Sequence, residues 1–226
     1  HYNFRIFSIM RKILNDDSNY WDNYYNHLNK SRTKIMPPSQ FAAFCCGELI
    51  NKDINFLVDI AAGDGRDTIF FANQGFKVFS LDKSCKSVKL LNEESINHPN
   101  VEVLKIDATI DELPQSSNLD LAIAYYARFF IHALEEAYLA KFFNNLSKTM
   151  KSSDYFFVEY RNEKDKNLHK ETSEHFRKFY KSKFIKSLGL KNGFDCIYEV
   201  NGKGFSKWKN DDASISRQIF IKKAEL

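Results

Sequence analysis

Two glycines and two carboxylates in this sequence have the types and spacing needed to hold a nucleoside. Gly63 and Gly65 lie in the run AAGDGRD, directly after the apolar run Phe56–Ile60. Glycine allows a backbone to turn tightly and to approach a ligand closely. Asp82 and Asp107 each end a later apolar run, where a carboxylate can accept hydrogen bonds from ribose hydroxyls and from an exocyclic adenine amine.

A third carboxylate, Asp59, lies inside the first apolar run. A buried carboxylate needs partners, which a ligand ammonium group or backbone donors would supply. Together the glycines and carboxylates describe a site for an adenosine with a cationic, amino-acid-like tail. A nicotinamide-binding GxGxxG turn is disfavoured, because Thr68 stands where the third glycine belongs. A plain strand–helix turn followed by helix-capping acids is the alternative without a ligand.

Alternating strand and helix patterns place these residues at the ends of strands. The pattern predicts an α/β fold with a doubly wound, mostly parallel sheet, whose ligands bind at the carboxyl ends of the strands. We expect the last strand to be antiparallel, because no long helix separates the final two strands. The expected strands are Phe56–Ile60, Lys77–Leu81, Val101–Ile106, Leu119–Ala124, Tyr155–Glu159, Cys196–Val200 and Gln218–Lys222.

Helical spacing of apolar residues predicts the intervening helices. The expected helical segments are Asp67–Asn73, Ser84–Glu93, the stripe Leu134, Tyr138, Phe142 and Leu146, and the stripe Phe176, Tyr180, Phe184 and Leu188. A further helix should start near Gln40, with Ser39 as its N-cap. We therefore expect an N-terminal helical lid segment at 1–52 and a Rossmann-like domain at 53–226, together forming one structural domain.

Composition excludes several classes of protein. The chain has 226 residues, a formal net charge of +4 and four cysteines. The cysteines form no CxxC pair, so neither a disulfide framework nor a metal site is expected. No apolar run approaches the ~20 residues of a membrane span, and no signal-peptide pattern is visible. We expect a reduced, cytoplasmic protein with no membrane span.

The run from Phe56 to Glu159 resembles class I S-adenosylmethionine-dependent methyltransferases, whose first motif reads approximately hhDhGxGxG. Asp59, Gly63 and Gly65 match that motif, and Ala61 replaces its first glycine. The resemblance implies that S-adenosylmethionine is the cofactor and S-adenosylhomocysteine the product, without a metal. It also implies the cofactor-binding residues, which are Asp59, Ala61, Gly63, Gly65, Arg66, Asp82, Lys83, Asp107, Ala108, Tyr125, Tyr24, Ser39 and Phe41.

The end of the fourth strand decides which acceptor is methylated. The run AYYARFFIHALEE lacks the Asp/Asn-Pro-Pro-aromatic motif of amino-methylating nucleic-acid enzymes and the Pro-Cys of cytosine-carbon enzymes. It offers Tyr126, Arg128 and His132 as catalytic candidates. Arg128 can grip a carboxylate or phosphate through two bonds, and His132 can act as a base or as a second cation. Their structural alternatives are a solvated arginine and a helix start.

Cations later in the chain extend this prediction to the substrate. Arg161, His175 and Arg177 are candidates for substrate binding beside Arg128, and their convergence would indicate an anionic acceptor. The patterns YWDNYYN, PPSQFAAF, RFFIHA, HFRKF and GKGFSKW are similar to those of methyltransferases from capsule and surface-polysaccharide gene clusters. This resemblance implies methyl transfer to oxygen of a phosphate-, phosphoramidate- or nucleotide-linked small molecule, such as an O-methyl phosphoramidate.

Two other functions remain open from the sequence. Mild basicity and the tyrosine pair leave room for an RNA methyltransferase or nucleic-acid-binding protein, although we expect no nucleic acid as a partner. A nicotinamide oxidoreductase is the third candidate. The sequence does not indicate an oligomeric state.

Overall fold

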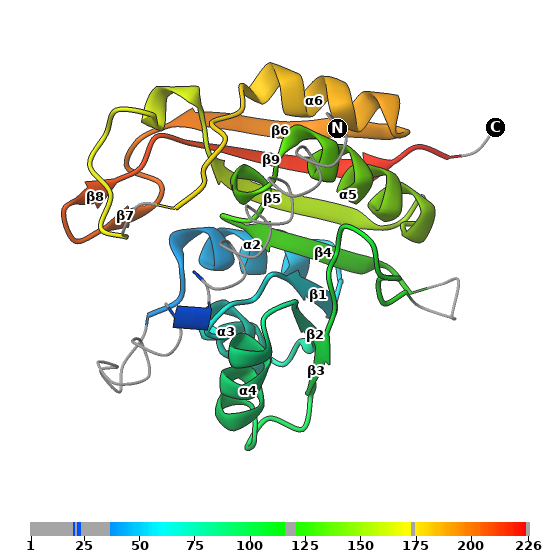
Figure 1. The fold of residues 1–226 in the computed structure, drawn as a ribbon. Coiled ribbons are helices and arrows are strands. Elements are labelled where there is room, and N and C mark those ends of the chain that lie inside the picture. The colour runs from blue at the N-terminus through cyan, green and yellow to red at the C-terminus, as the bar shows by residue number, and fades with distance from the viewer. Residues whose placement is uncertain (1–19, 21, 24–36, 116–120, 173–174, 225–226) are drawn as a thin grey trace, which may run out of the picture.

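The computed structural model describes residues 20, 22–23, 37–115, 121–172 and 175–224. Within these residues one sheet holds seven strands in the order β3-β2-β1-β4-β5-β9-β6, and a separate pair, β7–β8, lies to one side (Figure 1). The strands are β1 Phe56–Ile60, β2 Lys77–Asp82, β3 Val101–Lys105, β4 Ile123–Arg128, β5 Tyr155–Arg161, β6 Phe194–Gly202, β7 Lys207–Trp208, β8 Asp211–Asp212 and β9 Ile215–Lys222. The helices are α2 Gln40–Asn51, α3 Arg66–Asn73, α4 Cys85–Glu94, α5 Glu136–Thr149 and α6 Ser182–Lys191, with short 3-10 turns at Ile131–Ala133 and Glu163–Asp165.

The sheet winds outward from its centre in both directions, as the alternating pattern predicted. β1 pairs in parallel with β2 and β4, and the pairs β2–β3 and β4–β5 are also parallel. β9 is antiparallel to both of its neighbours, β5 and β6. The predicted doubly wound sheet with an antiparallel last strand is therefore confirmed, and the carboxyl ends of β1 to β5 share one edge.

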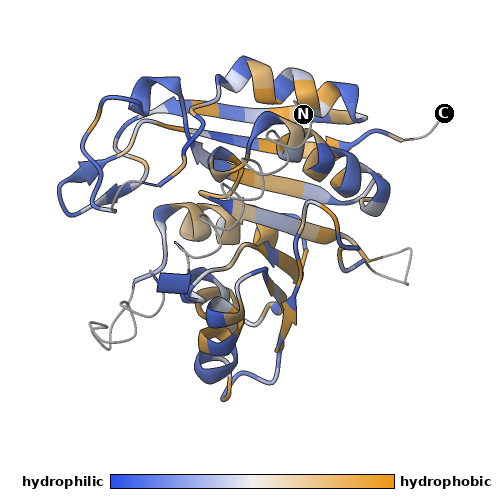
Figure 2. Cartoon of the chain, viewed as in Figure 1, coloured by the Kyte–Doolittle hydropathy of each residue, from blue (hydrophilic) through white to orange (hydrophobic). Residues whose placement is uncertain are grey.

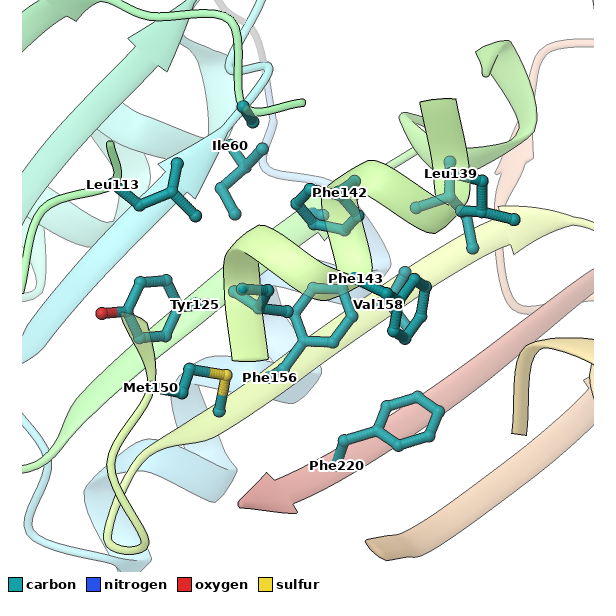
Figure 3. Close-up of a cluster of buried hydrophobic side chains, with 14 of the residues drawn as sticks. Ile60, Leu113, Tyr125, Leu139, Phe142, Phe143, Met150, Phe156, Val158 and Phe220 are labelled. Atoms are coloured by element: carbon teal, nitrogen blue, oxygen red, sulfur yellow. The ribbon is translucent and has the colours of Figure 1, made fainter. Parts of the chain in front are cut away.

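Apolar side chains alternate between the two faces of this sheet. Val58, Tyr125 and Phe156 belong to the cluster that packs against α5 and α6, and Figure 3 labels Tyr125 and Phe156 within it. Leu57 and Tyr126 pack on the other face, against α2 and α3. The central strands are apolar on both sides because both faces are covered (Figure 2).

The predicted strand Leu119–Ala124 was placed too early. β4 begins at Ile123 and continues through Arg128, while 116–120 lie outside the described residues. The carboxylate of Asp154 accepts the amide hydrogen of Ile123 at 2.8 Å, which fixes the start of the strand. The later end brings Arg128 into the sheet itself.

The predicted helical stripe from Phe176 to Leu188 is wrong in its first half, since α6 begins only at Ser182. The amide of Lys178 donates to the carbonyl of His132 at 2.7 Å, and Tyr180 forms a bridge with Asn162. These bonds hold the segment against the end of β5, so its backbone does not form helical hydrogen bonds.

The predicted N-cap is confirmed, because the Ser39 side chain accepts the amide of Ala42 at the start of α2. Among the described residues, no helix combines the length and the apolarity that crossing a membrane requires.

Candidate functional site

The glycine turn leaves the carboxyl end of β1 in a left-handed backbone conformation. Ala61, Gly63 and Gly65 have φ angles of 57°, 63° and 79°. Ala61 therefore adopts the conformation that a glycine would prefer, in keeping with its place in the motif. A Cβ on Gly65 would lie 2.8 Å from Cδ2 of Leu91, so a side chain here would displace the end of that leucine and would also be strained at this φ.

Asp82 holds this turn from the neighbouring strand. One carboxylate oxygen accepts the amide of Gly63 at 3.0 Å, and the other accepts the amide of Ser84 at 2.8 Å. The side chain is buried, and burial raises its pKa while these bonds oppose the rise. A carboxylate has about four acceptor positions, so Asp82 keeps acceptor capacity for ligand hydroxyls.

Asp107 lies two residues beyond the end of β3. Its Oδ1 accepts both the amide and the hydroxyl of Thr109, at 3.0 and 2.7 Å. Both bonds use the same oxygen, which leaves Oδ2 for another donor. The adjacent candidates differ in position, since Ala108 is buried in the core and Lys83 is exposed.

Asp59 is buried, and its partner is a hydroxyl. Thr68 donates to Oδ2 of Asp59 at 2.6 Å and lies 2.9 Å from the hydroxyl of Ser80. Burial, and to a lesser extent neighbouring Asp67 and Asp82, raise the pKa of Asp59 to about 8 against the effect of this bond. Thr68, which stands where a dinucleotide-binding turn would have its third glycine, therefore supplies the hydrogen-bond donor to the buried carboxyl of Asp59.

Asp67, at the start of α3, joins two of the predicted site residues. Its carboxylate accepts the amide and the hydroxyl of Ser39 at 2.8 and 2.7 Å, and the hydroxyl of Tyr126 at 2.7 Å. Burial opposes its ionisation, but Arg128, Arg66 and the Ser39 bonds outweigh burial and lower the pKa of Asp67. The hydroxyl of Tyr126 is thereby fully buried and used within the protein.

Two other predicted cofactor residues also lie in the core. Phe41 stacks on Tyr126 with ring centroids 5.0 Å apart. Tyr125 points to the opposite face, where its hydroxyl donates to the carbonyl of Pro114. Both rings are completely buried, so they shape the sheet under the turn.

Arg128 ends β4 beside the buried carboxylate of Glu159. Its Nε donates to Glu159 at 3.1 Å and its Nη2 donates to Ser206 at 3.0 Å. Arg217 from β9 donates to the other oxygen of Glu159 at 2.6 Å. Two arginines thus share one fully buried carboxylate, and the Arg128 side chain remains 19% exposed.

Arg161 is held by two carboxylates. It donates to Asp165 at 2.8 Å and forms two bonds with Asp211. The guanidinium groups of Arg161 and Arg128 both lie over the ring of Phe129, at 5.1 and 4.2 Å from its centroid. Phe129 has a φ of 55°, a strained conformation for a residue with a Cβ.

His132 is buried and neutral. Burial, followed by the charges of Arg161 and of further cations, lowers its pKa well below the usual value. Its Nδ1 accepts the amide of Arg161 at 3.2 Å, so the neutral ring carries its proton on Nε2. The Nε2–H group of the ring is therefore a hydrogen-bond donor.

Described residues of the N-terminal segment contact both the side of this edge with Asp82 and the side with the predicted substrate-binding residues. The ring of Tyr20 lies 4.7 Å from that of His175, and the hydroxyl of Ser84 donates to Asp22 at 2.6 Å. Arg177 donates to Thr172, and burial lowers its pKa, as does the charge of Arg161. Tyr24 lies outside the described residues.

The sequence interpretation missed three residues of this edge. Asp67 had a signal, since an acid in the first turn of a helix interacts favourably with the helix dipole. Thr68 was interpreted only as a missing glycine. Phe129 had no signal, because a phenylalanine at positive φ cannot be recognised from its type. Across the described residues, no group of three or more His, Cys, Asp or Glu side chains is arranged to hold a metal ion.

Comparison with known proteins places this geometry in context. The family model described as "Tellurite resistance protein TehB" matches residues 18–159. A search of the curated proteins finds no match.

Three solved structures illustrate the likeness of fold. An S-adenosylmethionine-dependent methyltransferase from Clostridium acetobutylicum has a TM-score of 0.64 at 11% identity, over 91% of this chain and 99% of that one. The glycopeptide N-methyltransferase MtfA, complexed with S-adenosylmethionine, has a TM-score of 0.63 at 12% identity, over 84% and 89%. An S-adenosylmethionine-dependent methyltransferase from Methanosarcina mazei has a TM-score of 0.65 at 12% identity, over 79% and 98%. Likeness at these identities shows the fold.

Proposed function

The chain belongs to the family described as tellurite resistance protein TehB, which matches more than half of its 226 residues, and on that premise we propose an enzyme that transfers a methyl group from S-adenosylmethionine to a small anionic acceptor. Its fold is that of the S-adenosylmethionine-dependent methyltransferases.

The glycine turn closed by Asp82 is the observation that carries the cofactor assignment. Left-handed backbone at Ala61, Gly63 and Gly65 allows close approach, and the amide of Gly63 is already bonded to Asp82. Asp82 retains acceptor positions for two ribose hydroxyls, and Asp107 retains Oδ2 for an adenine amine. The residues present therefore fit an adenosyl ligand at the carboxyl end of β1.

Positive charge beside the turn supports an anionic acceptor. Nη1 of Arg128 makes no hydrogen bond to another described residue, while Nε and Nη2 fix the plane of its guanidinium. A guanidinium fixed in this way binds a phosphate or carboxylate oxygen by a charge-assisted bond. Arg128 is therefore the acceptor-binding residue in this proposal, and Arg177 adds positive charge near His132.

The main contribution of the protein to the reaction is to align the acceptor with the methyl group. When bound, S-adenosylmethionine would supply a methyl group on a positively charged sulfur for transfer to the acceptor oxygen, with S-adenosylhomocysteine as the leaving group. An oxygen that arrives ionised needs no general base. A neutral His132 with its proton on Nε2 suits this case, since it donates to the acceptor and removes no proton. Tyr126 acts at a distance, because its hydroxyl orients Asp67.

The finer acceptor class rests on resemblance to methyltransferases of surface-polysaccharide pathways. We propose a phosphate, phosphoramidate or nucleotide-linked sugar, methylated at oxygen during capsule polysaccharide modification. We propose the cytoplasm as the compartment in which the protein acts.

Calorimetric titration with S-adenosylhomocysteine tests the cofactor assignment. We expect saturable binding and a rise in melting temperature, because a ligand that binds only the folded state stabilises it. Asp82→Asn should weaken binding about 10-fold or more, since it removes a charged acceptor of hydroxyl bonds. Absence of binding at millimolar ligand would refute the proposed function.

The family description mentions resistance to tellurite, and we propose tellurite as a second acceptor to be tested. Tellurite is itself a small oxyanion, and Arg128 offers it the same charge-assisted bond. Mass spectrometry after incubation with the cofactor should include tellurite beside phosphate esters and phosphoramidates. A mass gain on tellurite alone would assign the acceptor to the oxyanion and not to a sugar precursor.

A further inference from the structure

One short segment contacts four of the arginines at the carboxyl edge. This hairpin segment, residues 203–213, includes β7 and β8 and joins β6 to β9 (Figure 1). It was not expected from the sequence, where only its glycines and aromatics were noted. Successive residues of the hairpin segment contact different arginines. A shift of the segment would therefore move the arginine side chains as well.

The first contacts reach the pair of arginines that share Glu159. Ser206 accepts from Nη2 of Arg128 and donates to Glu159, each at 3.0 Å. The carbonyl of Phe205 accepts from Arg217, whose guanidinium also lies 5.4 Å from the Phe205 ring centroid. Ser206 is therefore a positioning residue for Arg128.

The far strand of the hairpin segment holds the next cation. The carboxylate of Asp211 accepts hydrogen bonds from both terminal nitrogens of Arg161, and Asp211 is only 4% exposed. Arg161 in turn lies over Phe129, the ring shared with Arg128. The segment thus bridges the ends of β4 and β5.

The tip of the segment presents an aromatic ring to solvent beside the glycine turn. Trp208 is 40% exposed, and its ring centroid lies 5.9 Å from the guanidinium carbon of Arg66. Arg66 is the first residue of α3, immediately after Gly65. The amide of Lys207 also donates to Gln40 at the start of α2, at 3.3 Å. The exposed ring therefore lies beside the residue that follows the glycine turn, two residues along the chain from the Ser206 that contacts Arg128.

From this arrangement we propose that the hairpin segment selects the acceptor, with Trp208 contacting a sugar or base ring attached to the anionic group that Arg128 binds. The proposal rests on the proposed function and narrows its acceptor to phosphate monoesters that carry a ring. A planar indole packs against the faces of sugars and bases alike, and such stacking contributes substantially to affinity.

Calorimetry on protein saturated with S-adenosylhomocysteine tests this directly. The probes are glucose 1-phosphate, uridine 5′-monophosphate and methyl phosphate, which share the phosphate monoester and differ in the attached ring. We expect at least one ring-bearing probe to bind about 10-fold tighter than methyl phosphate. Preference for the first probe identifies a sugar, and preference for the second identifies a base.

Trp208→Ala should abolish this preference while leaving methyl phosphate binding unchanged, and Trp208→Phe should retain most of it. Phe184→Ala is the matched control, because Phe184 is 37% exposed on α6 and stacks on Tyr180. Unchanged binding of S-adenosylhomocysteine shows that each variant is folded.

Equal binding of all three probes to the wild-type protein overturns the inference, as does a preference that survives in Trp208→Ala. Neither result touches the methyltransferase proposal, which fails only if S-adenosylhomocysteine itself does not bind.

Discussion

A carboxyl group with a raised pKa lies directly beneath the glycine turn. Burial, with a single hydroxyl donor and three other acids nearby, raises the pKa of Asp59 from the ordinary 3.8 to about 8. In the unliganded protein Asp59 is therefore a neutral acid at pH values below about 8. A ligand ammonium group beside it would restore the ionised form.

This shift predicts a pH dependence of folding in the unliganded protein. The folded state holds the proton more tightly than the unfolded state, so the stability contributed by Asp59 is complete below about pH 4 and is lost as pH rises toward 8. The free energy of unfolding should fall by up to about 1.4 kcal/mol per pH unit in that window. Urea denaturation at pH 6 and pH 8 measures the slope.

Asp59→Asn should flatten this slope. Asp195→Asn supplies the control, because it removes a carboxylate that is 51% exposed on β6. A slope that is identical in the wild-type protein and in Asp59→Asn would mean that Asp59 is ionised throughout.

Arg128 gives a second prediction at the scale of the residue. Arg128→Lys keeps the charge but loses the planar group that bonds Glu159 and Ser206 while facing the acceptor. We expect the KM for the acceptor to rise about 10-fold or more, with S-adenosylhomocysteine affinity within about threefold. Lys89→Met, on the exposed face of α4, is the control for surface charge. Loss of cofactor affinity with an unchanged acceptor KM would contradict this division of the site.

Among the elements, α2 and α3 are joined through one buried carboxylate. Asp67 receives three hydrogen bonds from Ser39 and Tyr126, so the start of α2 is fixed to the helix that follows the glycine turn. The predicted lid segment therefore ends in an element that is part of the core.

Two serine N-caps allow this junction to be tested. Ser39→Ala should cost about 1–3 kcal/mol of unfolding free energy, since it removes a donor to a buried carboxylate as well as a cap. Ser84→Ala removes the corresponding cap of α4 and a part-buried bond to Asp22, and should cost about 1 kcal/mol. Chemical denaturation of both variants gives the comparison. Equal costs would show that burial of the Ser39–Asp67 bond adds nothing to stability.

The sequence predicted the regular elements around the turn better than it predicted the acceptor side. The periodicity of apolar residues and the residues that form turns and caps are local signals. They were therefore sufficient to predict β1, α3, β2 and the Ser39 cap. The extended segment at 176–180 is held by bonds to His132 and Asn162, which are distant in sequence. Likewise the partners of Arg161 include Asp211, 50 residues away. Such pairings have no local signal.

For the whole molecule, the last strand completes a sheet whose other half carries the cofactor turn. β9 inserts between β5 and β6, buries Phe220 and brings Arg217 to Glu159. The region matched by the family model ends at 159, so that region lacks this strand.

A chain shortened after Asn162 should therefore fail to fold, although it contains the whole matched region. It exposes the edge of β5 and leaves Glu159, which is completely buried in the full chain, without Arg217. Circular dichroism and limited proteolysis measure the outcome. Removal of 224–226 is the control, since β9 ends at Lys222. A stable, protease-resistant shortened protein would contradict this dependence.

The shared carboxylate of Glu159 also couples the two sides of the sheet. Its two cations come from β4, which neighbours the strand of the glycine turn, and from β9, which lies on the other side of β5. Displacement of β9 would leave Glu159 with Arg128 as its remaining arginine partner and would draw that guanidinium toward the buried carboxylate. Readiness to bind an acceptor anion therefore depends on a strand that makes no contact with the cofactor turn in this proposal.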